Sequence, residues 1–354
     1  MTTLLVTSTS GGTGKTAITV ALGQLAQKEG ATVGYMKPKG TNLESAVGKT
    51  RDEDPMIARQ LLDLDAEMHQ LEPVVYSPTF VQEAIRGRAD PAELRADIET
   101  NFADLAADTD VMLLEGSDHH FTGGTVDLTD ADIAELLDAE VLLVSEYTEA
   151  VDVDEVIASG EEFGDRLAGV LFNDVSPDRY DELVEDAMPF LDGRGINSFG
   201  AVPHDEKLGG VTVSELADGI GAELLTPDLP DDGRIERFVV GAMGSSEALK
   251  QLRRTRNAAV ITGGDRSDIQ TAAMQAGGVG CVVLTGGYRP SNAVLGEATS
   301  NNVPIMLVQS DTRTTIDRTE SMLGSGRTRT PETVERMAAL LSDSVDVGSM
   351  LGLE

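Results

Sequence analysis

The sequence predicts an α/β protein whose main sheet is mostly parallel, with helices on both faces. Short aliphatic runs recur from the start of the chain to about residue 225, without the strict polar alternation of strands that have one solvated face. Stretches with helical periodicity separate these runs. The chain has 354 residues, 40% of them hydrophobic, which is enough for two domains with separate cores.

Six aliphatic runs are the expected strands of the first domain: residues 4–7, 32–36, 111–114, 141–144, 167–172 and 198–202. The expected helices include residues 17–28, 91–107 and 152–163. Strands that alternate with helices in this way form βαβ units, in which successive strands run parallel. We therefore assign residues 1–225 to one α/β domain.

A change of composition predicts a linker at residues 226–234, TPDLPDDGR, where two prolines and three aspartates offer no apolar face. Residues 235–315 are the expected second, smaller α/β domain. It contains a repeat of strand, Gly-Gly turn and helix start, AVITGGDRSD at 259–268 and VVLTGGYRPS at 282–291. Residues 316–354 are expected to add C-terminal helices, one with Pro331 in its first turn, and a frayed tail.

The charge balance excludes a general nucleic-acid-binding surface. The chain has 27 basic and 61 acidic residues, a formal net charge of −34, whereas a surface that follows a phosphate backbone needs clustered Lys and Arg. A folded chain with so many carboxylates is typical of salt-saturated cytoplasms, so we expect a halophilic protein. The chain has no apolar run of membrane-spanning length and no basic segment before its first apolar stretch, and we expect a cytoplasmic protein with no membrane partner. The single cysteine, Cys281, lies in an aliphatic run and is expected in the core.

A glycine-rich segment, SGGTGKT at 10–16, lies between the first expected strand and the first expected helix. Glycines allow the backbone to approach a phosphate closely, and the helix N-terminus that follows carries partial positive charge. In such loops a lysine contacts the terminal phosphates and the next hydroxyl binds Mg²⁺. The segment predicts a P-loop NTPase-type nucleotide site made by Gly11, Gly12, Thr13, Gly14, Lys15, Thr16 and Ala17.

Four segments in order, LLVTSTSGGTGKT, GYMKPKGT, VMLLEGS and GVLFNDV, resemble the dethiobiotin synthetase-like P-loop proteins. These include the N-terminal domain fused to many bacterial phosphotransacetylases. In that family the loop tolerates a residue other than glycine where Thr9 stands. The stretch that begins VVGAMGSSEALKQLRRTRNAAVITGGDRSD and reaches TGGYRPS resembles the DRTGG domain that follows it in phosphotransacetylases. Together the two resemblances cover about residues 1–315.

The resemblance implies roles for individual residues. Lys15 and Thr16 match the phosphate lysine and the magnesium hydroxyl. Lys37 matches a lysine that reaches the γ-phosphate and substrate, and Thr41 matches a nearby hydroxyl. The expected catalytic residues are therefore Lys15, Lys37 and Thr41.

The resemblance also implies a metal site and a base contact. Glu115 matches a Mg²⁺ carboxylate, Asp54, or less well Asp52, matches a second one, and Asn173 matches an amide that recognises adenine. The expected Mg²⁺ ligands are Thr16, Asp54 and Glu115. These residues follow strands, where open α/β sheets bind ligands. The RDEDP segment that contains Asp54 is equally compatible with an acidic surface loop.

The two Gly-Gly turns are a possible second ligand site, made by Gly263, Gly264, Asp265, Arg266, Gly286, Gly287 and Arg289. A Gly-Gly turn before a helix can bind an anion, with arginine as a forked donor. The alternative is that Asp265 and Arg266 form a pair that only ties the turn together. The sequence leaves both open.

The resemblance implies a regulatory Mg-nucleotide-binding protein, with ATP or GTP as ligand, that acts on acetate or acetyl-CoA metabolism through a partner enzyme. Related proteins form dimers, so a homo-oligomer is expected. Phosphotransacetylase activity is not expected, because that activity belongs to a further C-terminal domain and this chain ends shortly after the DRTGG-like region. The alternative is an ATP-dependent carboxylase or ligase of the dethiobiotin synthetase type. Lys37 and Thr41 favour it, whereas the segment KPKGTN departs from true synthetases. A weak NTPase activity is compatible with either reading.

Overall fold

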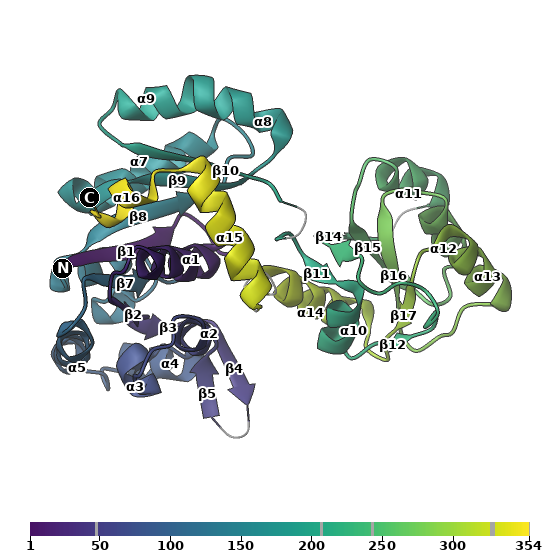
Figure 1. Cartoon of the computed structure of the whole chain (residues 1–354). Helices are drawn as coiled ribbons and strands as arrows, with labels where there is room; N and C mark the ends of the chain where they lie inside the picture. Colours follow the sequence, from purple (N-terminus) through teal and green to yellow (C-terminus); the bar gives the residue numbers. More distant parts are fainter. Residues whose placement is uncertain (47–48, 206–207, 242–243, 326–329, 354) are drawn as a thin grey trace. The chain divides into compact units, whose positions relative to one another are not determined.

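A six-stranded, all-parallel sheet forms the centre of the N-terminal part of the computed structural model (Figure 1). The order is β10-β9-β8-β1-β7-β2. The strands are β1 Thr2–Ser8, β2 Val33–Met36, β7 Val111–Glu115, β8 Glu140–Ser145, β9 Leu167–Val175 and β10 Ser198–Pro203. Each coincides with an expected run. The structure describes residues 1–46, 49–205, 208–241, 244–325 and 330–353.

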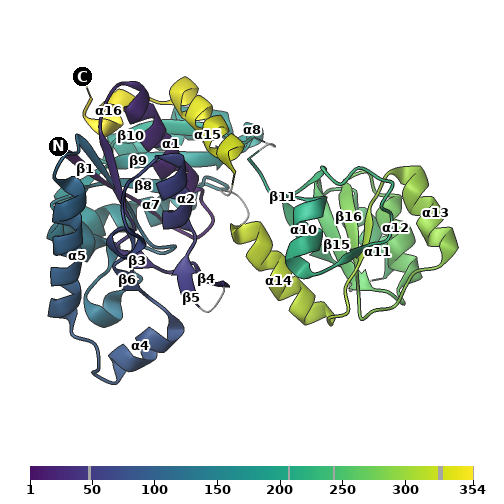
Figure 2. The same cartoon turned by 60° about the horizontal axis from the view of Figure 1, so that its bottom comes forward.

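Helices cover both faces of this sheet, as expected (Figures 1 and 2). On one face Leu5, Met112 and Leu143 pack with Ile98 and Val156 of two covering helices. On the other face α1 packs on β1 and β7, and α15 packs on α1 and β10. The helices are α1 Lys15–Lys28, α2 Asp54–Leu61, α3 Met68–Leu71, α4 Pro78–Ile85, α5 Pro91–Ala106, α6 Asp130–Leu136, α7 Asp152–Phe163, α8 Pro177–Glu182, α9 Met188–Asp192, α15 Pro331–Ser344 and α16 Val347–Leu351.

Two short strand pairs lie beside the main sheet. β3 Lys39–Gly40 pairs in parallel with β6 Val74–Val75, and β4 Leu43–Ala46 forms a hairpin with β5 Lys49–Asp52. Strands β3, β4 and β5 all belong to the segment that follows β2 in the chain. Their backbone hydrogen bonds hold this segment in place beside the main sheet. The predicted site residues Lys37, Thr41 and Asp54 all lie in or next to this segment.

A second sheet of order β12-β17-β16-β15-β14 is parallel except for β12 (Figure 1). Its strands are β12 Glu223–Leu224, β14 Arg237–Val240, β15 Ala258–Gly263, β16 Val279–Thr285 and β17 Ile305–Leu307; a separate pair is β11 Val211–Thr212 with β13 Arg234–Ile235. The helices are α10 Val213–Ile220, α11 Ser245–Leu252, α12 Ser267–Met274, α13 Asn292–Asn301 and α14 Thr312–Ser325. Cys281 is fully buried in this core, and burial raises the pKa of its thiol to about 12.

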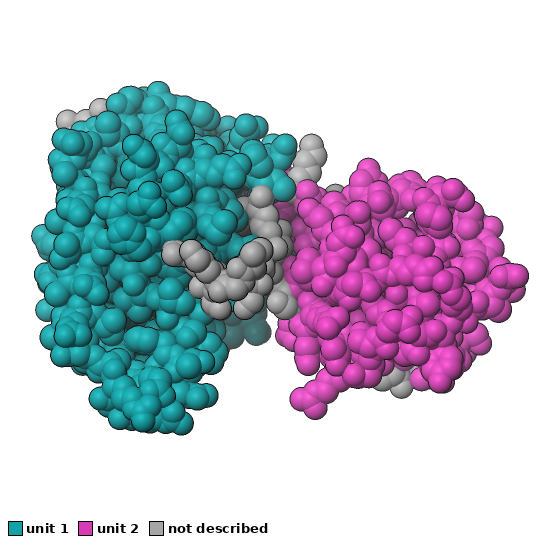
Figure 3. Space-filling model, turned by 90° about the horizontal axis from the view of Figure 1, so that it is seen from below, with its two compact units in different colours: residues 1–204, 328–354 teal, residues 205–327 magenta. Residues whose placement is uncertain are grey.

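The chain divides into unit 1, residues 1–204 with 328–354, and unit 2, residues 205–327 (Figure 3). The division therefore differs from the expected boundary at residue 225. Val211, Leu216 and Ile235 are buried in the same cluster as residues of β15 and β16, so the chain has entered the second core before the expected linker. Within that linker the hydroxyl of Thr226 accepts a hydrogen bond from the Ile305 N–H at 3.0 Å, which ties it to β17.

The C-terminal segment returns to unit 1. The hydroxyl of Thr330 caps α15 by accepting from the N–H of Thr333, and Pro331 lies in the first turn, where its missing N–H costs nothing. The expected frayed tail is instead helix α16, capped by Asp346, with Leu351 fully buried. Residues 326–329 and 354 of the expected C-terminal region lie outside the described residues. Within the described residues, the helices are too short or too polar to cross a membrane.

Candidate functional site

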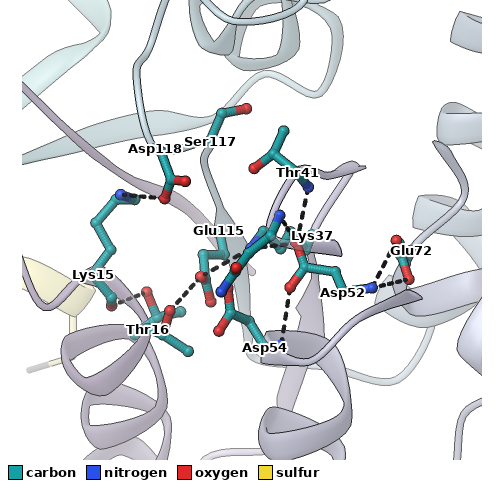
Figure 4. Close-up of polar contacts among 12 residues, drawn as sticks. Lys15, Thr16, Lys37, Thr41, Asp52, Asp54, Glu72, Glu115, Ser117 and Asp118 are labelled. Atoms are coloured by element: carbon teal, nitrogen blue, oxygen red, sulfur yellow. Dashed lines mark hydrogen bonds and ion pairs between the residues drawn. The ribbon is translucent and has the colours of Figure 1, made fainter. Parts of the chain in front are cut away.

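Strand register brings the predicted site residues of unit 1 to one edge of the sheet. β7 lies between β1 and β2, with Val6 opposite Glu115 and Met36 opposite Leu114. The glycine-rich loop that follows β1, the carboxylate that ends β7 and the lysine that follows β2 are therefore neighbours. Figure 4 shows Glu115 between Thr16 on one side and Lys37 with Asp52 and Asp54 on the other, while Lys15 points toward Asp118.

The glycine-rich loop has the backbone conformation that its glycines were expected to allow. Gly12 and Gly14 have φ of 79° and 86°, and α1 begins directly after Gly14. The Nδ2 group of Asn173 donates to the carbonyl of Thr13 at 2.8 Å. A Cβ on Gly14 would lie 2.7 Å from this Nδ2 and would have to displace it, and the left-handed φ of Gly14 would strain any other residue. The observed contact of Asn173 is thus with the loop itself.

Lys15 is almost fully buried, with 6% of its side chain exposed. Its ammonium donates to Ser8 Oγ at 2.9 Å and lies 3.8 Å from an oxygen of Asp118. Burial lowers the pKa of Lys15, and the nearby carboxylates of Asp118 and Glu115 oppose this shift. The lysine is held at the loop by protein oxygens on both sides.

Thr16 and Glu115 form a hydroxyl–carboxylate pair. Thr16 Oγ1 donates to Glu115 Oε1 at 2.7 Å, and the Tyr35 hydroxyl donates to the other oxygen at 2.8 Å. Burial raises the pKa of Glu115 to about 7, although the ammonium of Lys37 acts in the opposite direction. Tyr35 is a partner that the sequence reasoning missed, and only its place at the end of an apolar strand could have drawn attention to it.

Lys37 lies among three carboxylates. Its ammonium contacts Asp54, lies 2.8 Å from Asp52 Oδ2 and lies 3.7 Å from Glu115 Oε1. Burial lowers the pKa of Lys37, but these carboxylates raise it well above its usual value. Burial likewise favours the neutral form of Asp54, yet Lys37 holds the pKa of Asp54 below its usual range. Lys37 is therefore a charged group that compensates part of the negative charge of this carboxylate cluster.

Asp52 organises the segment that carries Thr41. It is fully buried, and its Oδ2 accepts from the N–H groups of Thr41 and Asn42 at 2.9 Å each. Its own N–H donates to the buried Glu72 at 3.3 Å. The Thr41 Oγ1 atom is buried without a hydrogen-bond partner. The sequence reasoning considered Asp52 only as a weaker metal ligand and missed Glu72, which lies after α3 and has no motif around it.

A second buried ion pair explains the unusual lysine of KPKGTN. Lys39 Nζ lies 2.8 Å from Asp130 Oδ1 and donates to the carbonyl of Thr122 at 3.0 Å. Asp130 also accepts from Thr7 Oγ1 at 2.6 Å and from the Ser117 N–H at 3.0 Å. Lys39 thus ties the segment after β2 to the loop after β7. The sequence reasoning noticed the segment KPKGTN as a departure but did not single out Lys39 or find its partner.

The oxygen atoms at this edge are of the kind that Mg²⁺ takes when phosphate oxygens and water complete its shell. Among the described residues, no set of three or more His, Cys, Asp and Glu side chains could hold a metal ion. Mg²⁺ commonly takes one or two protein oxygens and completes its shell with phosphate oxygens and water. Thr16 and Glu115 place two such oxygens side by side. Asp54 is bound to Lys37, and its role as a metal ligand stays a prediction.

The two Gly-Gly turns of unit 2 follow β15 and β16, which are adjacent, so the structure brings them together. A Cβ on Gly264 would lie 2.0 Å from the carbonyl oxygen of Tyr288, which shows how closely the turns approach. Gly286 and Gly287 have φ of 82° and 74°. Gln270 lies beneath the first turn and donates to the carbonyls of Gly263 and Gly264.

The N–H groups of these turns are engaged within the protein. Gly264 donates to the carbonyl of Thr285, Gly286 to that of Ser310 and Gly287 to that of Val308, at 2.9–3.2 Å. Arg266 contacts Asp268, and Arg289 contacts Glu223. These contacts favour the reading in which polar pairs tie the turns together, and the pair observed for Arg266 is with Asp268. A ligand at these turns stays a prediction.

The fold and this site define an α/β P-loop nucleotide-binding protein. The chain belongs to the family described as AAA domain (AAA_26), whose model matches residues 2–212, and a model described as DRTGG domain matches residues 215–322. The expected order of a P-loop domain and a DRTGG domain is confirmed.

Curated relatives confirm the resemblance found in the sequence. The chain is 24% identical over 344 residues to the phosphate acetyltransferase of Pseudomonas putida, covering 91% of this chain and 47% of that protein. It is 35% identical over 152 residues to the ATP-dependent dethiobiotin synthetase of Frankia casuarinae, covering 41% of this chain and 59% of that protein. The chain spans about half the length of the phosphate acetyltransferases it matches. Among solved structures, MinD of Aquifex aeolicus aligns with 59% of this chain and 84% of its own at 16% identity and a TM-score of 0.35.

Proposed function

We propose that unit 1 binds ATP or GTP together with Mg²⁺ and that the bound nucleotide is a regulatory signal. The observation that carries the proposal is a glycine-rich loop that ends in a buried lysine, Lys15, and in Thr16, whose hydroxyl donates to the carboxylate of Glu115. The buried Thr13 Oγ1 and Thr41 Oγ1 atoms have no hydrogen-bond partner among the residues that the structure describes. Buried polar atoms without partners are costly, and a polar ligand at this edge would satisfy them.

Each residue has a defined task in this proposal. The loop N–H groups and Lys15 bind the β- and γ-phosphates, and Thr16 and Glu115 hold Mg²⁺, with Asp54 as a further candidate ligand. The metal neutralises phosphate charge when bound. Lys37 would exchange one of its carboxylate partners for the γ-phosphate, and Asn173 would hold the loop while its remaining oxygen faces the base.

The regulatory part of the proposal rests on the second domain and on the relatives. A P-loop domain is joined here to a DRTGG domain, and the relatives that cover most of this chain are named phosphate acetyltransferase. We infer a partner enzyme of acetate or acetyl-CoA metabolism and a homo-oligomer in a salt-rich cytoplasm. Co-purification from cells grown on acetate would identify the partner.

Isothermal titration with Mg-ATP and Mg-GTP in KCl tests nucleotide binding directly. We expect saturable binding by the wild-type chain and at least a tenfold loss in Lys15→Ala, because the only loop lysine contacts the terminal phosphates. Lys28→Ala, an exposed change at the other end of α1, is the matched control and should bind as wild type. Identical heats for wild type and Lys15→Ala would refute the proposal.

One observation favours the alternative function, an ATP-dependent carboxylase or ligase of the dethiobiotin synthetase type. The Thr41 Oγ1 atom is buried without a partner among the described residues, and the Thr41 N–H and the Lys37 ammonium contact the same oxygen of Asp52. This alternative predicts ADP and phosphate release that depends on diaminopelargonic acid and bicarbonate. Release that is independent of both would leave only a background NTPase. The ion pair of Lys39 with Asp130 is a feature that the alternative does not need.

A further inference from the structure

Asp118 lies beside the glycine-rich phosphate loop, next to Gly11 and Lys15. Its Oδ1 atom is 3.8 Å from Lys15 Nζ. A Cβ on Gly11 would lie 3.6 Å from Asp118 Cβ and 3.9 Å from its Cγ, so the aspartate side chain rests against the loop backbone. Figure 4 shows the Asp118 carboxylate pointing at the Lys15 ammonium from the segment above it.

This placement is built into the fold on both sides of Asp118. The preceding residue, Ser117, is 1% exposed, and both its N–H and its hydroxyl donate to Asp130. Four residues further on, the carbonyl of Thr122 accepts from Lys39. Asp118 therefore projects toward Lys15 from a segment that is anchored at both ends by the Lys39–Asp130 pair.

An anion beside the loop lysine competes with a phosphate for the same charge. Lys15 has three N–H donors, and one of them is used by Ser8 Oγ. A nucleotide phosphate at this lysine would bring a second anion next to the Asp118 carboxylate, and like charges at such distances repel. Asp118 is 57% exposed, so its side chain can turn outward into solvent.

We propose that Asp118 is an affinity-determining residue of the phosphate loop: its carboxylate is a built-in counter-anion of Lys15 that an incoming nucleotide phosphate displaces. The inference rests on the proposed nucleotide function of unit 1 and names a residue that sets how tightly that site binds. The Asp118 carboxylate makes nucleotide binding weaker than it would be at the same loop without this charge. The site is therefore half-filled at a higher nucleotide concentration.

The size of the effect follows from the exposure of Asp118. Exposed ion pairs contribute about 0.2–1 kcal/mol, which corresponds to roughly a 1.4- to fivefold change in an equilibrium constant. Salt screens such pairs, because the Debye length falls from about 10 Å at 0.1 M to about 3 Å at 1 M. Removal of the charge should therefore tighten binding at low salt and matter little in concentrated KCl.

The test is titration of the full chain with Mg-ATP, Mg-GTP and inorganic pyrophosphate at two KCl concentrations. Asp118→Asn keeps the shape and removes the charge, and we expect up to about fivefold tighter binding at the lower salt and near-equal affinity at the higher. The matched control is Asp127→Asn, an exposed aspartate of the same connection whose φ of 50° asparagine tolerates. It removes the same charge away from Lys15 and should bind as wild type.

The outcomes separate the two proposals. Unchanged affinity in Asp118→Asn, or equal tightening in both variants, overturns the role of Asp118 while nucleotide binding stands. Weaker binding also overturns it, because it would make Asp118 a contributor to the metal or phosphate site. If the wild-type chain binds none of the three ligands, the proposed function fails, and the role of Asp118 fails with it.

Discussion

At the scale of single residues, the site is a set of buried charged groups that are paired with one another. Lys37 and Glu115 are 2% and 1% exposed, and Lys39 and Asp130 form a second pair that is just as deeply buried. A buried ion is tolerated only when it is paired and hydrogen-bonded, and breaking such a pair costs about 3–5 kcal/mol. Within the described part of the chain, the buried hydroxyls of Thr13 and Thr41 lack hydrogen-bond partners.

The buried carboxyl of Glu115 predicts a pH-dependent stability. Its pKa is about 7 in the folded chain against a reference value of 4.5. Between these values the folded chain holds a proton that the unfolded chain has released, so this group increases the free energy of unfolding as pH falls from about 7 toward 4.5, by at most about 1.4 kcal/mol per pH unit. Glu115→Gln should flatten the curve of unfolding free energy against pH, measured by urea denaturation.

The control for this measurement is Glu135→Gln, an exposed carboxylate on α6 of the same unit. It should leave the slope of the pH curve unchanged. A slope that is identical in wild type and Glu115→Gln would show that Glu115 is ionised throughout the window.

At the scale of secondary structure elements, helix α15 completes unit 1 from the far end of the chain. It packs on α1, the helix that begins at the phosphate loop, and on β10 at the edge of the sheet. Its buried residues include Val334, Met337 and Leu341. Without this helix the outer side of α1 would expose apolar surface, so the C-terminal segment is part of the nucleotide-binding unit.

Truncation of one α15 side chain tests this packing. Leu341 is fully buried, and Leu341→Ala should lower the free energy of unfolding of unit 1 by about 2–5 kcal/mol, because it removes apolar contacts and leaves a cavity. Glu335→Ala on the exposed face of the same helix should change it by no more than about 0.5 kcal/mol. Equal stability of the two variants in chemical denaturation would mean that α15 contributes little to unit 1.

At the scale of the whole molecule, the negative charge is distributed unequally between the two units. Residues 205–327 contain 16 acidic and 12 basic residues, whereas the rest of the chain contains 45 acidic and 15 basic residues. Unit 1 therefore carries most of the self-repulsion, and each unit has its own hydrophobic core. Screening of this repulsion by salt should favour the compact state of unit 1 more than that of unit 2.

Calorimetry of the full chain at rising KCl tests this expectation. Two cores predict two unfolding transitions, which hydrogen exchange can assign to the units. The unfolding temperature Tm of unit 1 should rise by several degrees more than that of unit 2 between dilute and multimolar KCl. A change of about 1 kcal/mol in the free energy of unfolding shifts the Tm of a domain of this size by roughly 2–4 °C. Parallel shifts of both transitions would contradict an electrostatic origin in unit 1.

The sequence by itself determined the class of fold, the six strands of the main sheet, the phosphate loop and the order of the two domains. These features depend on local patterns, namely aliphatic runs, helical periodicity and the glycines followed by Lys15 and Thr16. Such a pattern predicts the same local structure wherever the segment lies in the fold. The core position of Cys281 was predictable for the same reason.

Only the tertiary structure decided which residues complete the site and where the units divide. Tyr35, Glu72 and the pairing of Lys39 with Asp130 depend on side chains from segments that are far apart along the chain, and no local pattern encodes their distance. The boundary between the units differs from the expected one for the same reason. The sequence of α10 shows an amphipathic helix, but not that its apolar face packs on β15 and β16. The sequence of α15 shows a C-terminal helix, but not that it packs on α1. Periodicity shows that a face is apolar, but only the packed structure shows what covers it.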